Sequence, residues 1–202
     1  ITIEGESVQK LSSKELSILR RRKIGFVFQS FNLIPVLTAF ENASFPLNLL
    51  GYGDGEIRER TMHILDEVGL ADIADRRPAQ LSGGQQQRVA IARALVKEPS
   101  LVLADEPTAN LDSHTGEEIL KLMFDLNASH NTTFVFSTHD SMVMDYARRL
   151  VLLHDGTIHS DERRKTAATA ASAAAGGAAG SNRKKAAAAP GLRESTGRGG
   201  GI

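Results

Sequence analysis

The sequence predicts an α/β fold with a mostly parallel sheet, because short apolar runs alternate with segments of helical periodicity. The runs are too short for helices, and polar residues bound them on both sides. Their β-branched, aromatic and leucine side chains are typical of buried strands. The predicted strands are Ile24–Phe28, Leu101–Leu103, Phe134–Phe136 and Leu150–Leu153.

The elements before the first of these strands can be read from local signals. Ile1 and Ile3 alternate with polar neighbours, which indicates that the chain enters directly on a strand. Ser12 and Glu15 have the spacing of a capping box, so a helix is expected to begin there and to lead into the strand at Ile24.

The segment from about 32 to 80 continues in helical periodicity without a convincing strand, which predicts a helical subdomain inserted between sheet elements. Asp155-Gly156 fits a hairpin turn near the end of the domain. One helical face holds Ile57, Thr61, Ile64, Leu65 and Val68, and a later one holds Ile119, Leu122, Met123 and Leu126.

The composition changes near residue 160, which divides the chain into a domain over 1–160 and a tail over 161–202. The tail is rich in Ala, Gly and basic residues and is predicted to be disordered, because it offers little apolar surface to bury. Its basic clusters, Arg163–Lys165 and Arg183–Lys185, could touch nucleic acid or acidic lipid. A solvated tail is the preferred interpretation.

Charge and cysteine content exclude several classes of function. Lys+Arg and Asp+Glu both number 24, so no net charge draws the chain to nucleic acid, and no nucleic-acid partner is expected. The absence of Cys excludes disulfides, thiolate zinc sites and a cysteine nucleophile. No apolar run approaches the roughly 18 to 20 residues that span a bilayer.

The stretch Leu81–Arg88 has the pattern of an anion-binding helix start. Ser82 and Gln85 again have capping-box spacing, and the free amides of a helix N-terminus favour phosphate. Gly83 and Gly84 would let a ligand approach the backbone. Alone, the pattern is more often that of a capped helix after a turn, and only its context in the sequence favours a phosphate site.

Polar residues follow three of the predicted strands, at the edge where an open α/β sheet binds ligands. Asp105 is placed to hold Mg²⁺ through its water shell, and Glu106 to orient or deprotonate an attacking water. Gln29 and His139 are expected at the same edge. A serine-hydrolase interpretation of Ser137, His139 and Asp140 fails, because near-neighbours on one strand cannot form a triad.

Together these residues resemble the ATP-binding-cassette (ABC) ATPase family, over Ile1 to about Ser160. The likeness implies a P-loop NTPase-like core with an inserted helical subdomain. The matching positions are Gln29 for the Q-loop, Leu81–Gln85 for the signature motif, Leu101–Glu106 for the Walker B strand, Asn110–Asp112 for the D-loop and His139 for the switch histidine.

The resemblance implies ATP and Mg²⁺ as cofactors and assigns a role to each matching residue. Glu106 would act on the hydrolytic water and His139 on the γ-phosphate. Asp105 and Gln29 would serve Mg²⁺, and Gln29 would also couple the nucleotide state to a membrane permease. Ser82 and the backbone amides of Gly83 and Gly84 would contact ATP held by a second subunit, in a head-to-tail dimer. Gln29, Gln85 and Asp112 are also expected to bind the nucleotide.

One family motif does not occur: the 202 residues contain no G-x-x-x-x-G-K-[ST] loop. We therefore expect an N-terminally truncated cassette whose phosphate loop lies upstream of Ile1, and we expect the fragment alone to be inactive. The segment Gly25–Pro35 looks like the lipoprotein-releasing and macrolide-export branch, although Ala109 stands where that branch usually has Gly.

The resemblance implies an ATPase subunit of an export or lipoprotein-release transporter, bound to the inner face of the membrane through its permease. Two alternatives stay open. One is a non-transport ABC ATPase of DNA repair or the ribosome, although neither a persistent heptad pattern nor a second signature motif is present. The other is an inactive remnant that lacks its P-loop.

Overall fold

The computed structural model describes residues 1–164, which fall into two compact units divided between Ala147 and Arg148. Predictions for residues 165–202, including the basic cluster at 183–185, lie outside the described part. The domain limits at 32–80 and at 160 stay predictions. No helix among the described residues is long and apolar enough to cross a membrane.

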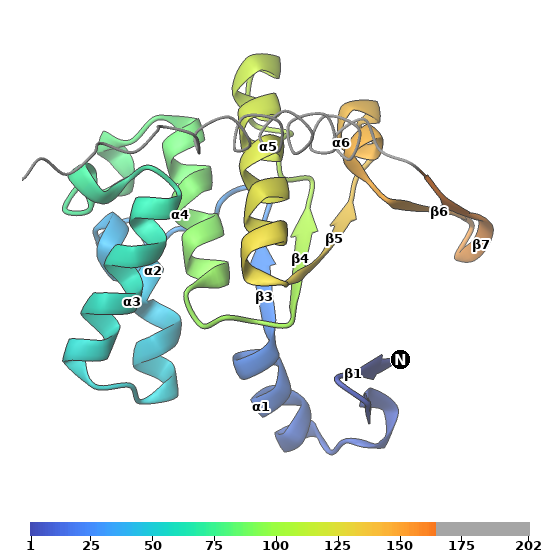
Figure 1. Ribbon diagram of the computed structural model, residues 1–202, viewed down its shortest axis with the longest axis horizontal. Coiled ribbons are helices and arrows are strands. Elements are labelled where there is room, and N and C mark those ends of the chain that lie inside the picture. Colours follow the sequence, from blue (N-terminus) through green and yellow to red (C-terminus); the bar gives the residue numbers. More distant parts are fainter. Residues whose placement is uncertain (165–202) are drawn as a thin grey trace, which may run out of the picture. The chain divides into compact units, whose positions relative to one another are not determined.

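A three-stranded parallel sheet organises the first unit (Figure 1). Its strands are β3 (Ile24–Val27), β4 (Leu101–Asp105) and β5 (Thr133–Ser137), in the spatial order β3-β4-β5. Helices alternate with these strands, so the predicted α/β class with a parallel sheet is confirmed. β4 is longer than the predicted strand Leu101–Leu103 and has Asp105 as its last residue.

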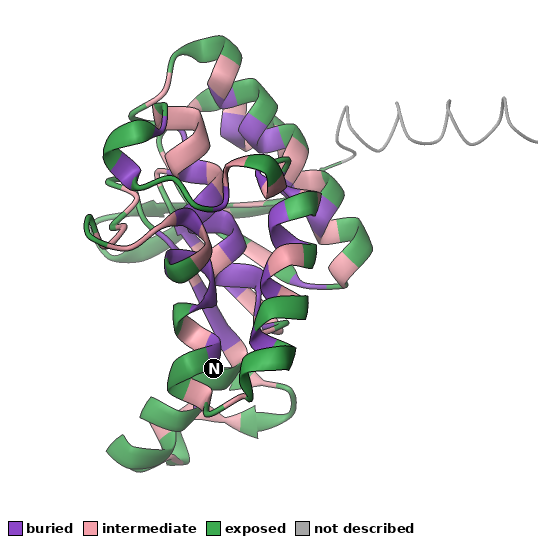
Figure 2. Ribbon diagram, turned by 90° about the vertical axis from the view of Figure 1, so that its left-hand side faces the viewer, coloured by how far each residue is buried: buried purple, intermediate pink, exposed green. Residues whose placement is uncertain are grey.

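Two helices supply much of the core beside this sheet. They are α4 (Gly83–Leu95) and α5 (Ser113–His130), and both share a hydrophobic cluster with the strands. Figure 2 shows buried residues concentrated where the strands and helices meet. The strand residues that this packing buries are Gly25, Val27, Val102 and Ala104.

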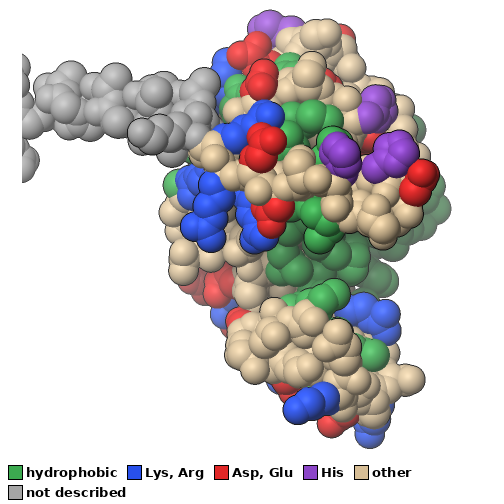
Figure 3. Space-filling view, turned by 90° about the vertical axis from the view of Figure 1, so that its right-hand side faces the viewer, with side chains coloured by type: hydrophobic (Ala, Val, Ile, Leu, Met, Phe, Trp, Pro, Cys, Tyr) green, Lys and Arg blue, Asp and Glu red, His purple; other side chains and the backbone are tan. Residues whose placement is uncertain are grey.

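The opposite face of the sheet is more open than the sequence suggested. The parallel register aligns Phe26, Leu103 and Val135 on that face. Val135 is 49% exposed and Phe28, just after β3, is 38% exposed, so these strands are not buried on both faces. The space-filling view accordingly shows hydrophobic side chains gathered on one face of the molecule (Figure 3).

Between β3 and β4 the described chain contains helices and no strand. These are α2 (Ala39–Leu50), α3 (Asp54–Glu67), the short 3₁₀ turns η2 (Ala71–Ile73) and η3 (Pro78–Gln80), and α4. The face predicted from Ile57 to Val68 is buried at every one of its five positions.

The remaining elements of the first unit precede β3 or follow β5 in the sequence. The strands β1 (Thr2–Ile3) and β2 (Glu6–Ser7) form an antiparallel pair, followed by the 3₁₀ turn η1 (Val8–Lys10). The helix α1 (Ser13–Lys23) begins at the predicted Ser12/Glu15 capping box. The short helix α6 (Ser141–Tyr146) follows β5.

The second unit contains the hairpin of β6 (Arg149–His154) and β7 (Thr157–Arg163). The predicted Asp155-Gly156 turn joins them. The prediction that Leu150–Leu153 forms a buried strand is wrong, because β6 pairs only with β7 and Leu153 is 65% exposed. The hairpin also continues to Arg163, beyond the predicted limit at 160.

Candidate functional site

Glu106 and His139 meet at the carboxyl edge of the sheet. Glu106 directly follows β4, and His139 lies two residues beyond β5, so the parallel register brings them together. Oε1 of Glu106 lies 2.5 Å from Nδ1 of His139 and accepts a hydrogen bond from the His139 backbone N–H at 3.2 Å. Thr138 donates its hydroxyl to Oε2 at 3.1 Å. The sequence therefore placed this pair at the correct edge.

The surrounding residues fix both the backbone conformation and the ionisation of Glu106. Its φ angle is +44°, in the left-handed region that costs a non-glycine residue about 1–3 kcal/mol, and its N–H donates to the Ser137 carbonyl at 2.9 Å. Partial burial acts to raise the pKa of Glu106, but hydrogen bonds from His139 and Thr138 outweigh it and lower the pKa overall. The carboxylate is therefore ionised at neutral pH.

An open cleft of about 360 Å³ lies beside this carboxylate. Its lining residues are largely polar and come from the loop after β4, the loop after β5 and the start of α6. The His139 side chain is 88% exposed, so most of its ring is accessible from solvent. The lining residues are Glu106, Thr108, Ala109, His139, Asp140 and Ser141.

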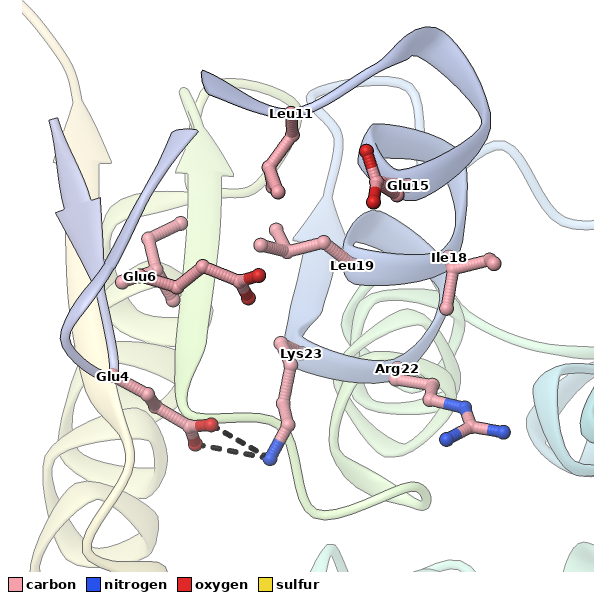
Figure 4. A pocket seen from close by; sticks show the side chains of 9 residues that line it. Glu4, Glu6, Leu11, Glu15, Ile18, Leu19, Arg22 and Lys23 are labelled. Atoms are coloured by element: carbon pink, nitrogen blue, oxygen red, sulfur yellow. Dashed lines mark hydrogen bonds and ion pairs between the residues drawn. The ribbon is translucent and has the colours of Figure 1, made fainter. Parts of the chain in front are cut away.

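A second cavity, of about 230 Å³, lies between the β1/β2 pair and α1 (Figure 4). Leu11 and Leu19 point into it, and an ion pair of 2.8 Å between Lys23 and Glu4 stands at its side. None of the predicted site residues lines this cavity. We therefore place the candidate site at the cleft beside Glu106.

Gln29 lies exposed just beyond β3, next to the strand that ends in Asp105. Asn110 donates its side-chain amide to the Gln29 carbonyl at 2.9 Å, which ties the loop after Glu106 to the loop after β3. The guanidinium of Arg93, from α4, donates to two carbonyls further along the same loop, those of Phe31 and Asn32. Neither hydrogen-bonded contact could be predicted from a local sequence pattern, because its two partners are distant along the chain.

The signature stretch forms the start of α4, as predicted. The Ser82 hydroxyl accepts from the Gln85 N–H at 3.3 Å, and the Gln85 side chain accepts from the Ser82 N–H at 2.9 Å. Within residues 1–164 no hydrogen bond joins this helix start to Glu106 or His139. The start of α4 and the Glu106–His139 pair are therefore separate groups of residues in this chain.

Packing within the chain requires glycine at position 84, whether or not a ligand also approaches it. A Cβ atom there would lie 2.6 Å from Cγ2 of Thr115. Thr115 is itself fixed, because its hydroxyl donates to Asp112 at 2.7 Å and its N–H donates to Asp112 at 3.0 Å. These same hydrogen bonds lower the pKa of Asp112. Asp112 is thus the N-cap of α5 and holds the side chain that packs on Gly84.

Gln87 is a residue that the sequence analysis missed. It is fully buried on α4 and donates its Nε2 to the Pro107 carbonyl at 2.7 Å, one residue after Glu106. Its Oε1 has no hydrogen-bond partner among the described residues. The sequence feature that could have pointed to it is a glutamine on a helix face that is otherwise apolar.

The oxygen ligands at this edge fit Mg²⁺ in its usual protein environment. The described residues contain no cluster of three or more His, Asp or Glu that could enclose a metal. Mg²⁺ typically keeps several waters and is held by one or two protein oxygens together with substrate phosphates. Asp105, exposed at the end of β4, and the amide oxygen of Gln29 suit that mode.

Comparison with known proteins identifies the family of this chain. The sequence profile of the ABC transporter family matches residues 1–109. The chain belongs to the ABC transporter family. This confirms the resemblance inferred from the signature and Walker B motifs.

Two relatives of this ABC chain come from the predicted branch. A lipoprotein-releasing system ATP-binding protein of Bacteroides thetaiotaomicron is 45% identical over 80% of this chain and 74% of its own length. A macrolide export ATP-binding/permease protein of Syntrophobacter fumaroxidans is 49% identical over 78% of this chain. The chain spans 22% of that second protein.

A solved structure shows the same ABC fold. It is a dimeric ATP-binding cassette in a post-hydrolysis state, bound to ADP and phosphate, with a TM-score of 0.70 and 45% identity to this chain. The match covers 81% of this chain and 72% of the solved one.

Proposed function

We propose that this chain is the ATP-binding and ATP-hydrolysing subunit, or part of it, of an ABC transporter that drives export or lipoprotein release through a membrane permease. The Glu106–His139 pair carries the proposal, because it sets an ionised carboxylate beside an exposed imidazole at the ligand-binding edge of a parallel sheet. The names of the relatives support a transport role.

Each residue of the cleft has a chemical task in this proposal. Glu106 orients the attacking water and accepts its proton, which its lowered pKa allows at neutral pH. The exposed ring of His139 is available to donate to the γ-phosphate. Asp105 and Gln29 would hold Mg²⁺, which when bound supplies positive charge against the phosphate oxygens.

The half-site at the start of α4 calls for a second subunit. Ser82, Gly83, Gly84 and Gln85, together with Asp112, would contact ATP bound by the opposite subunit of a head-to-tail dimer. The dimeric state of the solved relative supports this arrangement. The permease partner would hold the assembly at the inner face of the membrane.

The alternative that a specific observation favours is an inactive remnant, since none of the 202 residues forms a glycine-lysine phosphate loop. A direct test compares Mg-ATP binding by this chain with binding by a version extended at its N-terminus with a segment that supplies a G-x-x-x-x-G-K-[ST] loop. We expect only the extended protein to bind Mg-ATP, and its Glu106→Gln variant to dimerise with ATP.

A matched control is Glu98→Gln, because Glu98 is an exposed glutamate that also has a positive φ but pairs with Arg60 away from the cleft. It should hydrolyse ATP at the parent rate. If the extended protein binds no ATP, the chain is a remnant and the roles given to Asp105 and Glu106 are withdrawn. ATP hydrolysis by the pure 202-residue chain would overturn its expected inactivity.

A further inference from the structure

The turn that follows Gln29 has an unfavourable backbone conformation. Phe31 and Asn32 are consecutive and have φ angles of +58° and +50°. Asn tolerates this left-handed region better than most residues, but Phe does not. Inside the turn, the Phe31 N–H donates to the Phe28 carbonyl at 3.1 Å, and the Asn32 N–H donates to the Ser30 carbonyl at 2.6 Å. Something outside the turn must therefore stabilise it.

Arg93 of α4, which lies more than 60 residues further along the chain, provides that stabilisation. Its Nη2 donates to the Phe31 carbonyl at 2.7 Å, and its Nη1 donates to the Asn32 carbonyl at 2.5 Å. Two carbonyls that converge on one point suit the planar fork of a guanidinium. A lysine ammonium offers a point charge without that fork, so it would not reproduce the geometry.

The helix that carries Arg93 is itself fixed against the sheet. A Cβ atom at Gly25 of β3 would lie 2.7 Å from the carbonyl oxygen of Ala94, the residue after Arg93. Helix and strand therefore touch through their backbones at this point. On the other side of the turn, Asn110 holds the Gln29 carbonyl. The Gln29 loop is thus anchored by α4 and by the loop that follows Glu106.

We propose that Arg93 is a positioning residue that makes α4 and the Gln29 loop move as one body. α4 begins at Ser82 and Gly83, so a ligand at that helix start and the loop that presents Gln29 are joined by a single helix. This last step rests on the proposed function, because it takes Ser82 as the contact to a partner's nucleotide. The anchoring of the loop does not rest on it.

Hydrogen–deuterium exchange of the nucleotide-free 202-residue chain tests the anchoring directly. In Arg93→Gln, exchange at Phe31–Leu33 should become at least about tenfold faster, while exchange at Thr133–Ser137 stays unchanged. Arg93→Lys should give an intermediate rate, since it keeps the charge and loses the fork. If Arg93→Gln does not fold, the comparison is made with Arg93→Lys.

Arg88 offers a matched control on the same helix. It is also half-buried and donates its Nη1 to a backbone carbonyl, that of Val68, at 3.1 Å. Arg88→Gln should speed exchange near Val68–Leu70 and leave Phe31–Leu33 as it was. Unchanged exchange at Phe31–Leu33 in Arg93→Gln, or an equal acceleration at every peptide, would overturn the proposal.

A second readout addresses the link to the nucleotide. In an ATP-hydrolysing assembly that contains this chain, Arg93→Lys should lower kcat about tenfold and leave the KM for Mg-ATP unchanged. If exchange changes as expected but no variant or parent hydrolyses ATP, the anchoring stands and the proposed function fails. If exchange is unchanged, the inference fails whatever the ATPase assay shows.

Discussion

The Nδ1 atom of His139 lies 2.5 Å from Oε1 of Glu106, although 33 residues separate them along the chain. The contact exists because β4 and β5 are adjacent parallel strands that end at the same level, with Asp105 paired to Ser137. Any polar residues placed just after these two strands would meet. The fold therefore sets the geometry of the pair, and the identity of the two residues sets its chemistry.

Removing His139 should raise the pKa of Glu106. Burial alone acts to raise this pKa, and the hydrogen bonds from His139 and Thr138 keep it below the ordinary value of 4.5. In His139→Ala, burial is opposed mainly by Thr138, so we expect the titration of Glu106 to shift upward. NMR titration of the glutamate carboxyl carbons measures this, with Glu106→Gln to assign the signal and His114→Ala as a control. An unchanged Glu106 titration in His139→Ala would contradict the assignment.

The same lowered pKa makes stability depend on pH in a defined direction. Because the folded-state pKa of Glu106 lies below its unfolded value, its contribution is present above about pH 4.5 and is lost as the pH falls through the folded pKa. The free energy of unfolding should therefore fall less steeply below pH 4.5 in Glu106→Gln than in the parent. Urea unfolding at a series of pH values checks this, and parallel curves would contradict it.

Ser82 and Ser12 allow the capping role of a serine to be separated from its role toward a ligand. Both form complete capping boxes, at α4 and α1 respectively. Either Ser→Ala change should cost about 0.5–2 kcal/mol of unfolding free energy, because one helix amide loses its partner. Only Ser82→Ala should also lower ATP hydrolysis in a dimeric assembly. Equal loss of activity in both variants would show that the effect at Ser82 is one of stability alone.

The capping boxes and the strand-end residues could be predicted because their signals are local. Ser82 and Gln85 are three residues apart, and Glu106 directly follows an apolar run. The hydrogen bonds of Arg93, Asn110 and Gln87 could not be predicted, since each side chain donates to a backbone carbonyl at least 20 residues away. Every residue has a backbone carbonyl, so the identity of a residue does not show whether its carbonyl accepts such a hydrogen bond.

The error at β6 has a different cause. An apolar run such as Leu150–Leu153 predicts a strand but not what covers it. In its own unit β6 pairs with β7 alone, so Leu152 and Leu153 stay exposed and none of its leucines is fully buried. The open face of the main sheet at Val135 shows the same limit, because burial depends on neighbours that a strand pattern does not specify.

Gly25→Ala should destabilise the fold by about 1–3 kcal/mol, because the added methyl group meets a backbone oxygen that cannot move aside. Gly55→Ala is the matched control. Gly55 lies in the first turn of α3 with nothing within 4 Å of the added atom, so alanine there should stabilise by up to about 1 kcal/mol. Chemical denaturation measures both. A neutral Gly25→Ala would show that β3 and α4 do not touch in solution.

Gln87→Met should destabilise the fold by about 1 kcal/mol, although Met has similar volume and removes the unpartnered Oε1. The cost arises because the Pro107 carbonyl loses its donor in a buried place, and that penalty exceeds the relief. Gln86→Met is the control, since Gln86 also donates from α4 to a carbonyl, that of Leu81, but is only half-buried. Because Pro107 adjoins Glu106, only Gln87→Met should also slow ATP hydrolysis in an active assembly. The measurements are thermal unfolding and the ATP turnover rate of both variants. Identical behaviour of the two variants would mean that the buried hydrogen bond of Gln87 does not hold the loop after Glu106.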